Sequence, residues 1–216
     1  MARGRFITLE GGEGAGKSTQ LALVGDVVRA AGYEVVATRE PGGTPRAERI
    51  RELLLEKAAE PMPPSCELLL MFAARASHVE NLIKPALERG AWVVCDRFTD
   101  ASYAYQGAGR GMSLEPIRAL ETIVQAGLEP DLTLLLDTPV AVGLQRAQQR
   151  NSSQHGDADR FESEQAAFFE RVRLGYLEIA KRAPQRVRLI DAARPIEQVS
   201  KDVRAVLQQF IAGVRQ

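Results

Sequence analysis

Residues Gly11 to Ser18 read Gly-Gly-Glu-Gly-Ala-Gly-Lys-Ser and fit the phosphate-binding pattern G-x-x-x-x-G-K-[ST]. In such a loop the glycines let backbone N–H groups turn inward around phosphate oxygens. Lys17 supplies a positive charge to the β- and γ-phosphates, and the Ser18 hydroxyl can bind Mg²⁺. The pattern therefore predicts a nucleoside triphosphate site, formed by Gly11, Gly12, Glu13, Gly14, Ala15, Gly16, Lys17, Ser18 and Thr19.

This loop lies where the pattern requires it, between a strand and a helix. Residues 6–9 form a short apolar, β-branched run, and residues 18–24 begin a run of helical character. The positive end of the helix dipole then points at the same anion. A glycine-rich turn that matches by accident is the alternative, but the fixed positions coincide by chance in under about 1% of chains of this length.

Strand and helix signals alternate along the chain. Strands are expected at Phe6–Glu10, Glu34–Thr38, Ala91–Asp96, Leu132–Asp137 and Val187–Asp191. Most of them are continuous apolar runs, as in a parallel sheet covered on both faces. The expected fold class is therefore α/β: a P-loop NTPase-type three-layer fold with a five-stranded parallel sheet, helices on both faces and a short lid segment.

Three of the expected strands end in an acidic residue, namely Glu10, Asp96 and Asp137. Right-handed crossovers place these ends at one edge of the sheet, where ligands bind. Glu10 and Asp96, together with Ser18, are therefore candidate Mg²⁺ ligands. Arg97 follows directly and would bring a guanidinium to a second phosphate, which suits transfer to an acceptor phosphate. A strand-end salt bridge is the alternative interpretation of the Asp96–Arg97 pair.

A phosphate loop alone leaves three classes open: a kinase, a GTPase switch and a motor ATPase. A GTPase should carry an N-K-x-D element for guanine, and this tetrapeptide does not occur. A motor ATPase should end a strand in paired acids, whereas Asp96 is followed by Arg97. These differences favour a kinase.

The composition bounds the remaining possibilities. The 216 residues suit a single domain over 1–216, and 28 Lys and Arg balance 28 Asp and Glu, so no net field favours nucleic acid or a membrane as partner. No apolar run reaches the roughly 20 residues that span a bilayer, and no signal peptide is expected. Cys66 and Cys95 are too few for a disulfide framework, which indicates the cytoplasm.

Two long helices and one loop are expected in addition. The stretch from Cys66 to Arg89 is apolar nearly all round its first half, so we expect one face on the sheet and another against a second copy, in a homodimer. Phe161 to Arg182 carries a core stripe of helical spacing. The polar, turn-rich stretch from Asn151 to Asp159 is predicted to be a mobile loop between two helices.

Motifs beyond the phosphate loop are similar to those of the bacterial thymidylate kinases. The matching segments run in the order of that family over essentially the whole chain: residues 9–19, Thr38-Arg39-Glu40-Pro41-Gly42-Gly43-Thr44, Phe72-Ala73-Ala74-Arg75, Asp96-Arg97-Phe98, Tyr105-Gln106-Gly107 and Asp159-Arg160-Phe161-Glu162. The second segment, taken with the phosphate loop, is highly specific. The resemblance implies in-line transfer of the γ-phosphoryl group from MgATP to dTMP, giving dTDP.

The resemblance also implies where the acceptor phosphate binds. Arg97 and Arg39 would hold this phosphate, with Arg51 nearby, and Glu40 would orient the guanidinium groups. Pro41 belongs to the turn that follows the second strand. No strong general base is required, because the second pKa of a phosphate monoester is about 6 and the acceptor is already an anion near neutral pH.

For the nucleoside, the resemblance assigns Arg75 to the thymine carbonyl O4. Ser102 and Gln106 would read the pyrimidine edge, and Tyr105 would lie against the deoxyribose. Glu13 would reach toward the 3′-hydroxyl or the metal. Another nucleotide or nucleoside kinase is the main alternative, separated by these pyrimidine-reading residues, and a nucleotide-switch binding protein is less favoured.

Two features depart from relatives or leave a choice. The aromatic residue that stacks on the base in many relatives lies four positions before the arginine, where this chain has Met71; Phe72 lies three before. We expect helix rotation to bring Phe72 over the base, with Met71 packing on it as the alternative. The two histidines, His78 and His155, are expected to be structural or solvated.

The phosphate loop carries no arginine, so the positive charge on the transferring group must come from elsewhere. The bacterial type of the family places it in the lid, here roughly 147–161. Arg146, Arg150 and Arg160 are available, and Arg150 and Arg160 are the candidate catalytic residues beside Lys17 and Arg97. Solvated basic positions at a loop edge are the alternative for each.

Overall fold

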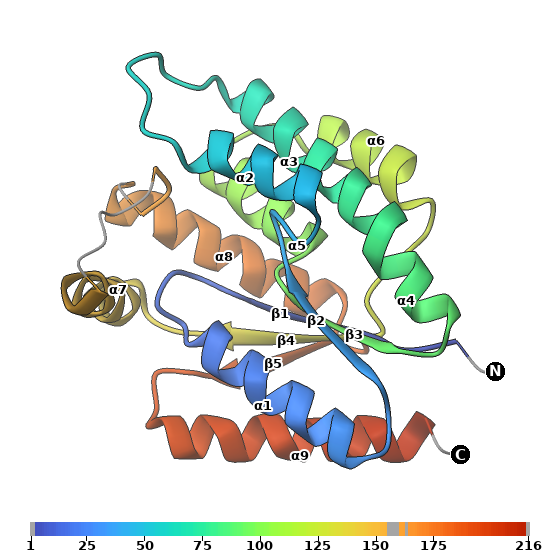
Figure 1. Cartoon of the computed structure of the whole chain (residues 1–216). Coiled ribbons are helices and arrows are strands. Elements are labelled where there is room, and N and C mark those ends of the chain that lie inside the picture. Colours follow the sequence, from blue (N-terminus) through green and yellow to red (C-terminus); the bar gives the residue numbers. More distant parts are fainter. Residues whose placement is uncertain (1–2, 155–159, 163, 215–216) are drawn as a thin grey trace.

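The computed structural model describes residues 3–154, 160–162 and 164–214, and its centre is one parallel sheet (Figure 1). The strand order is β2-β3-β1-β4-β5. The strands are β1 (Phe6–Gly11), β2 (Val35–Arg39), β3 (Trp92–Asp96), β4 (Leu132–Asp137) and β5 (Val187–Asp191). The predicted five-stranded parallel sheet is therefore confirmed, with each strand within one residue of its expected ends.

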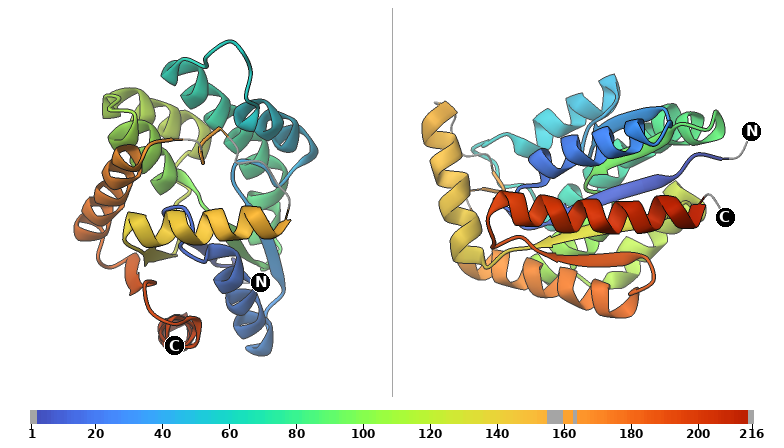
Figure 2. Two further views of the ribbon diagram at one scale, coloured as in Figure 1. Left: turned by 90° about the vertical axis from the view of Figure 1, so that its left-hand side faces the viewer. Right: turned by 90° about the horizontal axis from the view of Figure 1, so that it is seen from below.

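Helices cover both faces of this sheet, as predicted. They are α1 (Lys17–Ala30), α2 (Pro45–Leu55), α3 (Pro64–His78), the π-helical segment η1 (Val79–Ile83), α4 (Lys84–Glu88), α5 (Thr99–Ser102), the π-helical segment η2 (Tyr103–Gly109), α6 (Leu114–Gln125), α7 (Val140–Gln154), α8 (Ala166–Arg182) and α9 (Ile196–Val214). Helices α1 and α9 share one face with a core of apolar strand residues. The other helices, apart from α7, lie on the opposite side (Figures 1 and 2).

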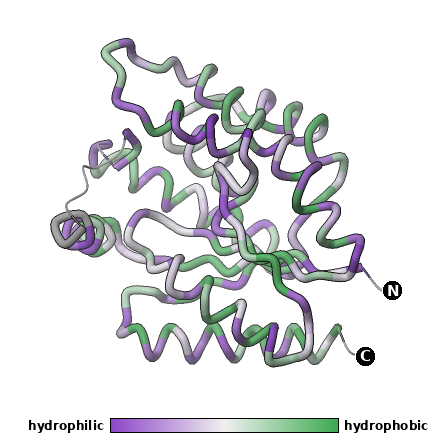
Figure 3. The backbone as a smooth tube through the Cα atoms, in the orientation of Figure 1, coloured by the Kyte–Doolittle hydropathy of each residue, from purple (hydrophilic) through white to green (hydrophobic). Residues whose placement is uncertain are grey.

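The apolar runs that predicted the strands do form the core. Hydrophobic residues follow the strands at the centre of the molecule (Figure 3). Residues of β1, β3 and β4 are almost completely buried, whereas the edge strands β2 and β5 are only partly covered. Burial on both faces explains why the central strands lack the polar alternation of a half-exposed sheet. Among the described residues, no helix is long and apolar enough to cross a membrane.

The register brings the candidate site residues together at one edge. Leu9 pairs with Asp96, and Asp96 pairs with Arg39 on the other side of β3. The carboxyl ends of β1, β2 and β3 therefore meet, and the residues that follow each strand start from the same place. Helix α7 lies across this edge of the sheet (Figure 2).

Three helical predictions need correction. The expected helix from Cys66 to Arg89 is continuous but widens into η1 just before Pro85, which has no N–H to donate. Helix α8 begins at Ala166, so Phe161 precedes it. The expected loop from Asn151 to Asp159 is partly wrong, because α7 continues through Gln154: serine and asparagine disfavour a helix only mildly. Residues 155–159 lie outside the described part.

Candidate active site

The phosphate loop connects β1 to α1 and opens toward solvent at the edge of the sheet. Gly16 has φ +85° and precedes the first helical residue, Lys17. The Lys17 ammonium is almost buried and donates to the carbonyl oxygens of Gly11 (3.3 Å) and Gly12 (3.0 Å). Burial lowers the pKa of Lys17 from its usual value. The ammonium is thus held by the loop's own backbone, at the N-terminus of a helix suited to bind anions.

Helix α7 approaches this loop through a pair of glycines. A Cβ on Gly14 would lie 2.0 Å from the carbonyl oxygen of Gly143, and one on Gly143 would lie 2.3 Å from that of Glu13. Gly14 also has φ +66°, so only glycine fits comfortably. Arg146 and Arg150 follow Gly143 by three and seven residues and share its helical face. Both of them line the pocket over the phosphate loop.

A second pocket lies beside the first. It is lined by Glu13, Glu40, Pro41, Arg51, Leu55, Met71, Arg75, Arg97, Phe98, Ala101, Ser102, Tyr105, Gln106 and Phe161. Four of these residues also line the phosphate-loop pocket: Glu13, Glu40, Arg51 and Arg97. The two pockets therefore share a wall of two acidic and two basic side chains, and a group bound in one can meet a group bound in the other.

Arg97 occupies the centre of this shared wall in an unusual backbone conformation. Its φ is +69°, in the left-handed region that non-glycine residues seldom adopt. Its guanidinium donates to the carbonyl oxygen of Gly11 (2.9 Å) and to the hydroxyl of Tyr176 (3.1 Å), and it lies 4.8 Å from the centre of the Tyr105 ring. These contacts hold the positive charge of Arg97 between the two pockets.

Glu10 lies behind Arg97 and is fully buried. Its carboxylate accepts from the Phe98 N–H (2.7 Å) and the Tyr176 hydroxyl (2.8 Å). Burial, aided by Asp100, raises the pKa of Glu10 to about 8, although Arg97 acts in the opposite direction. Both oxygens of this candidate metal ligand are thus occupied by protein donors in the structure.

The other candidate metal ligands have free capacity. Asp96 Oδ1 is buried and has no hydrogen-bond partner among the described residues. Ser18 is exposed at the start of α1, and both residues line the phosphate-loop pocket. A carboxylate oxygen and a hydroxyl facing the site of a triphosphate are the hard ligands that Mg²⁺ prefers, so the residues present fit this ion. Asp137, the third strand-end acid, instead pairs with Arg173 (2.7 Å).

Glu13 gathers the arginines around the phosphate loop. Its carboxylate lies 3.2 Å from Arg150 and 3.9 Å from Arg97. Burial alone would raise the pKa of Glu13, but nearby cations lower it below the usual value; the largest contributions come from Lys17, Arg97 and Arg150. Glu13 therefore keeps its negative charge and holds Arg97 and Arg150 beside the phosphate loop, where these cations could bind a phosphate.

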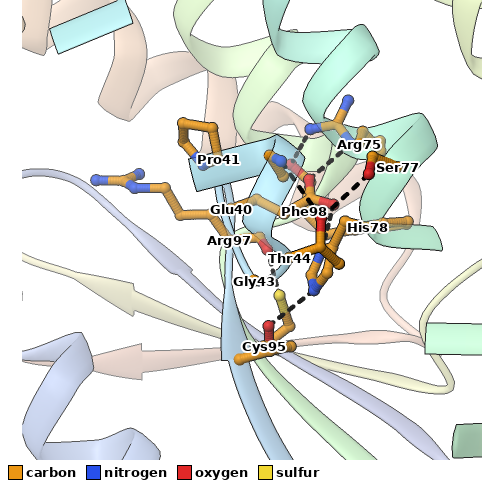
Figure 4. A network of polar contacts seen from close by, with 12 residues as sticks. Glu40, Pro41, Gly43, Thr44, Arg75, Ser77, His78, Cys95, Arg97 and Phe98 are labelled. Carbon is orange, nitrogen blue, oxygen red and sulfur yellow. Dashed lines mark hydrogen bonds and ion pairs between the residues drawn. The ribbon is translucent and has the colours of Figure 1, made fainter. Parts of the chain in front are cut away.

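Arg75 lies in a buried position on α3, within a network of polar contacts (Figure 4), and lines the second pocket. Its Nε donates to Glu40 (2.7 Å), and its terminal nitrogens donate to the Ser102 hydroxyl (3.0 Å) and the Phe98 carbonyl oxygen (3.1 Å). Burial opposes ionisation of Glu40, but Arg75 and His78 hold the pKa of this carboxyl below its usual value. The structure thus brings Arg75 and Ser102 together, as the sequence suggested. Glu40, which was expected to orient the arginines of the acceptor phosphate, instead contacts Arg75 and His78.

On the other side of this pocket, Gln106 is held by a buried carboxylate. Its amide donates to Glu67 Oε1 (2.9 Å), and Glu67 also binds Arg110 and Arg160. Arg160 Nη1 lies 2.7 Å from Glu67, and its Nε donates to the carbonyl oxygen of Leu54. The expectation that Arg160 reaches the phosphates is not met: the strong attraction of the buried Glu67 charge holds it outside the phosphate-loop pocket.

The choice between Met71 and Phe72 also comes out differently from our expectation. Phe72 is buried in a cluster with Leu68 and Ile117, and Arg75 lies over its ring at 4.6 Å. Met71 lines the second pocket. The helix is rotated so that Phe72 faces the core, and of these two residues it is Met71 that lines the second pocket.

The remaining predicted residues lie at or near the shared wall. Arg51 donates to the Pro41 carbonyl oxygen (2.9 Å) and lines both pockets. Arg39 is half exposed, pairs with Glu48 (2.8 Å) and lines only the phosphate-loop pocket. Tyr105 lines the second pocket, in ring contact with Phe161.

Sequence reasoning missed three residues that support the site. Tyr176 lies in the stretch from Phe161 to Arg182, where only a core stripe was predicted, yet its hydroxyl joins Arg97 to Glu10. Glu67 holds Gln106, and His78 contacts Glu40. A usable signal existed for two of them: a buried tyrosine hydroxyl needs a polar partner, and His78 follows Arg75 by three residues on the same helical face. Nothing in the local sequence identifies Glu67.

Comparisons with known proteins agree with this geometry. The family model described as "Thymidylate kinase" matches residues 9–203. The chain is 58% identical to a protein named "Thymidylate kinase" from Pseudomonas putida (strain GB-1), over 98% of this chain and 99% of that protein. It is also 58% identical to one from Chromohalobacter salexigens, over 99% of both. A crystal structure of thymidylate kinase from Ehrlichia chaffeensis superposes with a TM-score of 0.75 at 34% identity, covering 95% of this chain and 99% of the other.

Proposed function

The chain belongs to the thymidylate kinase family, and we propose that it transfers the γ-phosphoryl group of ATP to dTMP, giving ADP and dTDP. The observation that carries this proposal is the wall shared by two pockets, because transfer between two bound phosphates needs adjoining sites. ATP binds at the phosphate loop, and dTMP binds in the pocket lined by Arg75.

The acceptor phosphate lies against Arg97 and Arg51, the two basic residues of the shared wall, with Arg39 nearby. Since the phosphate of dTMP is already an anion near neutral pH, it needs no base to attack. Lys17 and Arg97 offset the negative charge that gathers on the transferring group. Catalysis then consists of positioning and charge stabilisation by groups already in place.

Ser18 and Asp96 would hold the Mg²⁺ that accompanies ATP, with Glu10 behind them at the end of β1. The ion supplies charge neutralisation on the β- and γ-phosphate oxygens when bound. The unpartnered Asp96 Oδ1 supports this assignment.

The base is recognised by donors from Arg75 and Gln106. An arginine N–H matches the carbonyl at C4 of thymine, where cytosine carries an amino group. Ser102 fixes one terminal nitrogen of Arg75, Met71 packs on the base and Tyr105 lies against the deoxyribose. The wrong base leaves buried donors of the site unpaired, and this penalty discriminates strongly against it.

The test is an assay that couples ADP release to acceptor identity. We expect turnover with dTMP, lower turnover with dUMP, and none above background with CMP, AMP or GMP. A reaction without acceptor is the control for ATP hydrolysis. Greatest activity with CMP or AMP would favour another nucleotide kinase and overturn the assignment.

The lid arginines are expected to differ in effect. Arg150→Ala should lower kcat about 10- to 100-fold, because Arg150 lines the phosphate-loop pocket and stabilises charge on the transferring group. The matched variant Arg160→Ala should change kcat less than about threefold, because Arg160 binds Glu67 instead. Steady-state kcat and the dTMP dissociation constant check both. A larger loss of kcat in the Arg160 variant would contradict the assignment.

We also propose a homodimer through α3 and its neighbours. Helix α3 contacts α2 and α6, and each carries an exposed large apolar residue: Leu53 (52%), Leu69 (58%) and Ile123 (75%). Such apolar exposure on adjoining helices is typical of an interface. Light scattering should give twice the chain mass of 23.6 kDa, falling to that mass in Leu69→Glu. Leu174→Glu, at an exposed position on α8, is the control that should leave the dimer intact. A monomeric wild-type protein at micromolar concentration would contradict it.

A cytoplasmic location and a single domain over 1–216, with a lid over roughly 147–161, stay predictions from the sequence.

A further inference from the structure

Behind Arg75 lies His78, a buried polar residue that lines neither pocket. Glu40 Oε2 accepts from Arg75 Nε at 2.7 Å, and Glu40 Oε1 lies 2.9 Å from His78 Nδ1 (Figure 4). His78 is completely buried and lines neither the phosphate-loop pocket nor the acceptor pocket. The two oxygens of one carboxylate are therefore bound by two side chains that stand three residues apart on α3.

The imidazole of His78 is also held from its other side. Its Nε2 lies 2.7 Å from the hydroxyl of Thr38, which precedes Glu40 by two residues at the end of β2 and so projects in the same direction. An ionised carboxylate can only accept, so Nδ1 is the nitrogen that carries the proton toward Glu40. His78 is thus clamped between Thr38 of β2 and Glu40, the residue that directly follows this strand.

The loop after β2 closes over this clamp. Gly43 has φ +85°, and a Cβ there would lie 2.4 Å from Thr38 Oγ1 and 2.5 Å from His78 Nε2. No side chain fits at this position of the loop. The strand, the helix and the loop together therefore fix where the imidazole stands, and with it the Glu40 oxygen that it contacts.

The orientation of the Arg75 guanidinium depends on Glu40. An arginine has five N–H donors, and three nitrogens of Arg75 each make one contact, with Glu40, Ser102 and the Phe98 carbonyl. The N–H groups left over belong to the two terminal nitrogens of this pocket-lining residue. Together with the contacts to Ser102 and the Phe98 carbonyl, the bond from Nε to Glu40 sets the plane of the guanidinium, and so the direction in which those N–H groups point.

We propose that His78 is a positioning residue for recognition of the acceptor base. By fixing the Glu40 carboxylate, it sets the orientation in which Arg75 presents its remaining donors to the carbonyl at C4 of the pyrimidine. The proposal rests on the proposed function and deepens it. Loss of the contact between His78 and Glu40 should lower the discrimination between dTMP and dCMP. An Arg75 N–H group that points in the wrong direction no longer prefers the carbonyl of thymine to the amino group of cytosine.

The experiment compares two amides that replace different nitrogens of the imidazole. In His78→Asn the amide nitrogen stands near the position of Nδ1 and can still donate to Glu40. In His78→Gln it reaches the position of Nε2 and meets Thr38 instead. Both variants bury one primary amide, so each is the control for the other. The readouts are kcat/KM for dTMP and dCMP, kcat at saturating dTMP, KM for ATP and the thermal unfolding midpoint.

We expect the dTMP-to-dCMP ratio of kcat/KM to fall at least about tenfold in His78→Gln and to stay within about threefold of wild type in His78→Asn. The loss should come from KM for dTMP, with kcat and KM for ATP within about threefold in both. Should the glutamine variant not fold, His78→Leu also lacks the Nδ1 contact and replaces it.

Two outcomes would overturn the proposal. An equal loss of the dTMP-to-dCMP ratio in both amide variants would show that the Nδ1 contact with Glu40 is not what matters. No loss in either variant would mean that His78 is merely structural, because such a residue affects the unfolding midpoint and not the ratio. A wild-type protein inactive on dTMP is a different result: it would overturn the proposed function, and the wild-type measurement alone reveals it.

Discussion

Replacing Lys17 with alanine is expected to lower kcat by about two to four orders of magnitude. Lys17 begins α1 beneath the pocket for the triphosphate, and its ammonium rests on two carbonyl oxygens of the loop. On binding, this charge moves to the β- and γ-phosphates, where negative charge gathers during transfer. The substitution therefore removes stabilisation of the transition state. Single-turnover measurements should show the lower rate in the chemical step.

The control for this variant is acceptor binding. Lys17 does not line the pocket that contains Arg75, so the dTMP dissociation constant should change less than about threefold. The fold should persist, because the Lys17 ammonium donates to two carbonyl oxygens of the loop, and Arg97 and Arg150 still lie beside the Glu13 carboxylate when it is removed. Near-normal turnover in a folded Lys17→Ala protein would remove the phosphate loop from the mechanism.

Replacing Arg97 with alanine should damage both turnover and acceptor binding. Arg97 lines both pockets, and its guanidinium is held by the Gly11 carbonyl, Tyr176 and the Tyr105 ring. We expect kcat/KM for dTMP to fall about 10³-fold or more, because one planar fork serves two phosphates. Isothermal calorimetry with dTMP and steady-state kinetics separate the two contributions.

Arg97→Lys is the matched variant. It keeps the charge and loses the fork, so it should recover only part of the activity lost in Arg97→Ala. Full recovery would show that a point charge suffices and that the geometry of the shared wall is unimportant. Because φ at this position is +69°, both substitutions carry a similar backbone strain, and their difference reports the side chain.

The architecture could be predicted because it depends on patterns that are local in the sequence. The central strands are uninterrupted apolar runs, and the phosphate loop has its glycines at fixed positions between a strand and a helix. The site residues at the ends of β1, β2 and β3 followed from the rule that parallel strands share a ligand-binding edge. Predictions from such local patterns hold because the local preference of each segment agrees with its place in the folded protein.

The errors concern choices that only tertiary contacts decide. Whether Met71 or Phe72 meets the base depends on the rotation of α3, and the apolar cluster around Leu68 and Ile117 takes Phe72. Arg160 had two possible anions, and the buried Glu67 carboxylate holds it. Ile117 lies far along the chain from Phe72, and Glu67 lies far from Arg160, so spacing alone could not select these partners.

One glycine, by contrast, carried a signal in the sequence that could have been used. The close approach of Gly14 to Gly143 explains why Arg146 and Arg150 of α7 line the phosphate-loop pocket. In the sequence, Gly143 is an isolated glycine in a helical stretch, a feature that often marks close packing. It could have indicated which lid arginines face the loop.

The most direct test of the shared wall is the stereochemical course of transfer. If the two phosphates meet across Arg97 and react in line, the γ-phosphoryl group passes once from ATP to dTMP. With ATP made chiral at the γ-phosphorus by sulfur and oxygen isotopes, the dTDP formed should then show inversion of configuration at that phosphorus. Retention would mean two successive transfers through an enzyme-bound phosphoryl group, and it would contradict direct transfer between adjoining pockets.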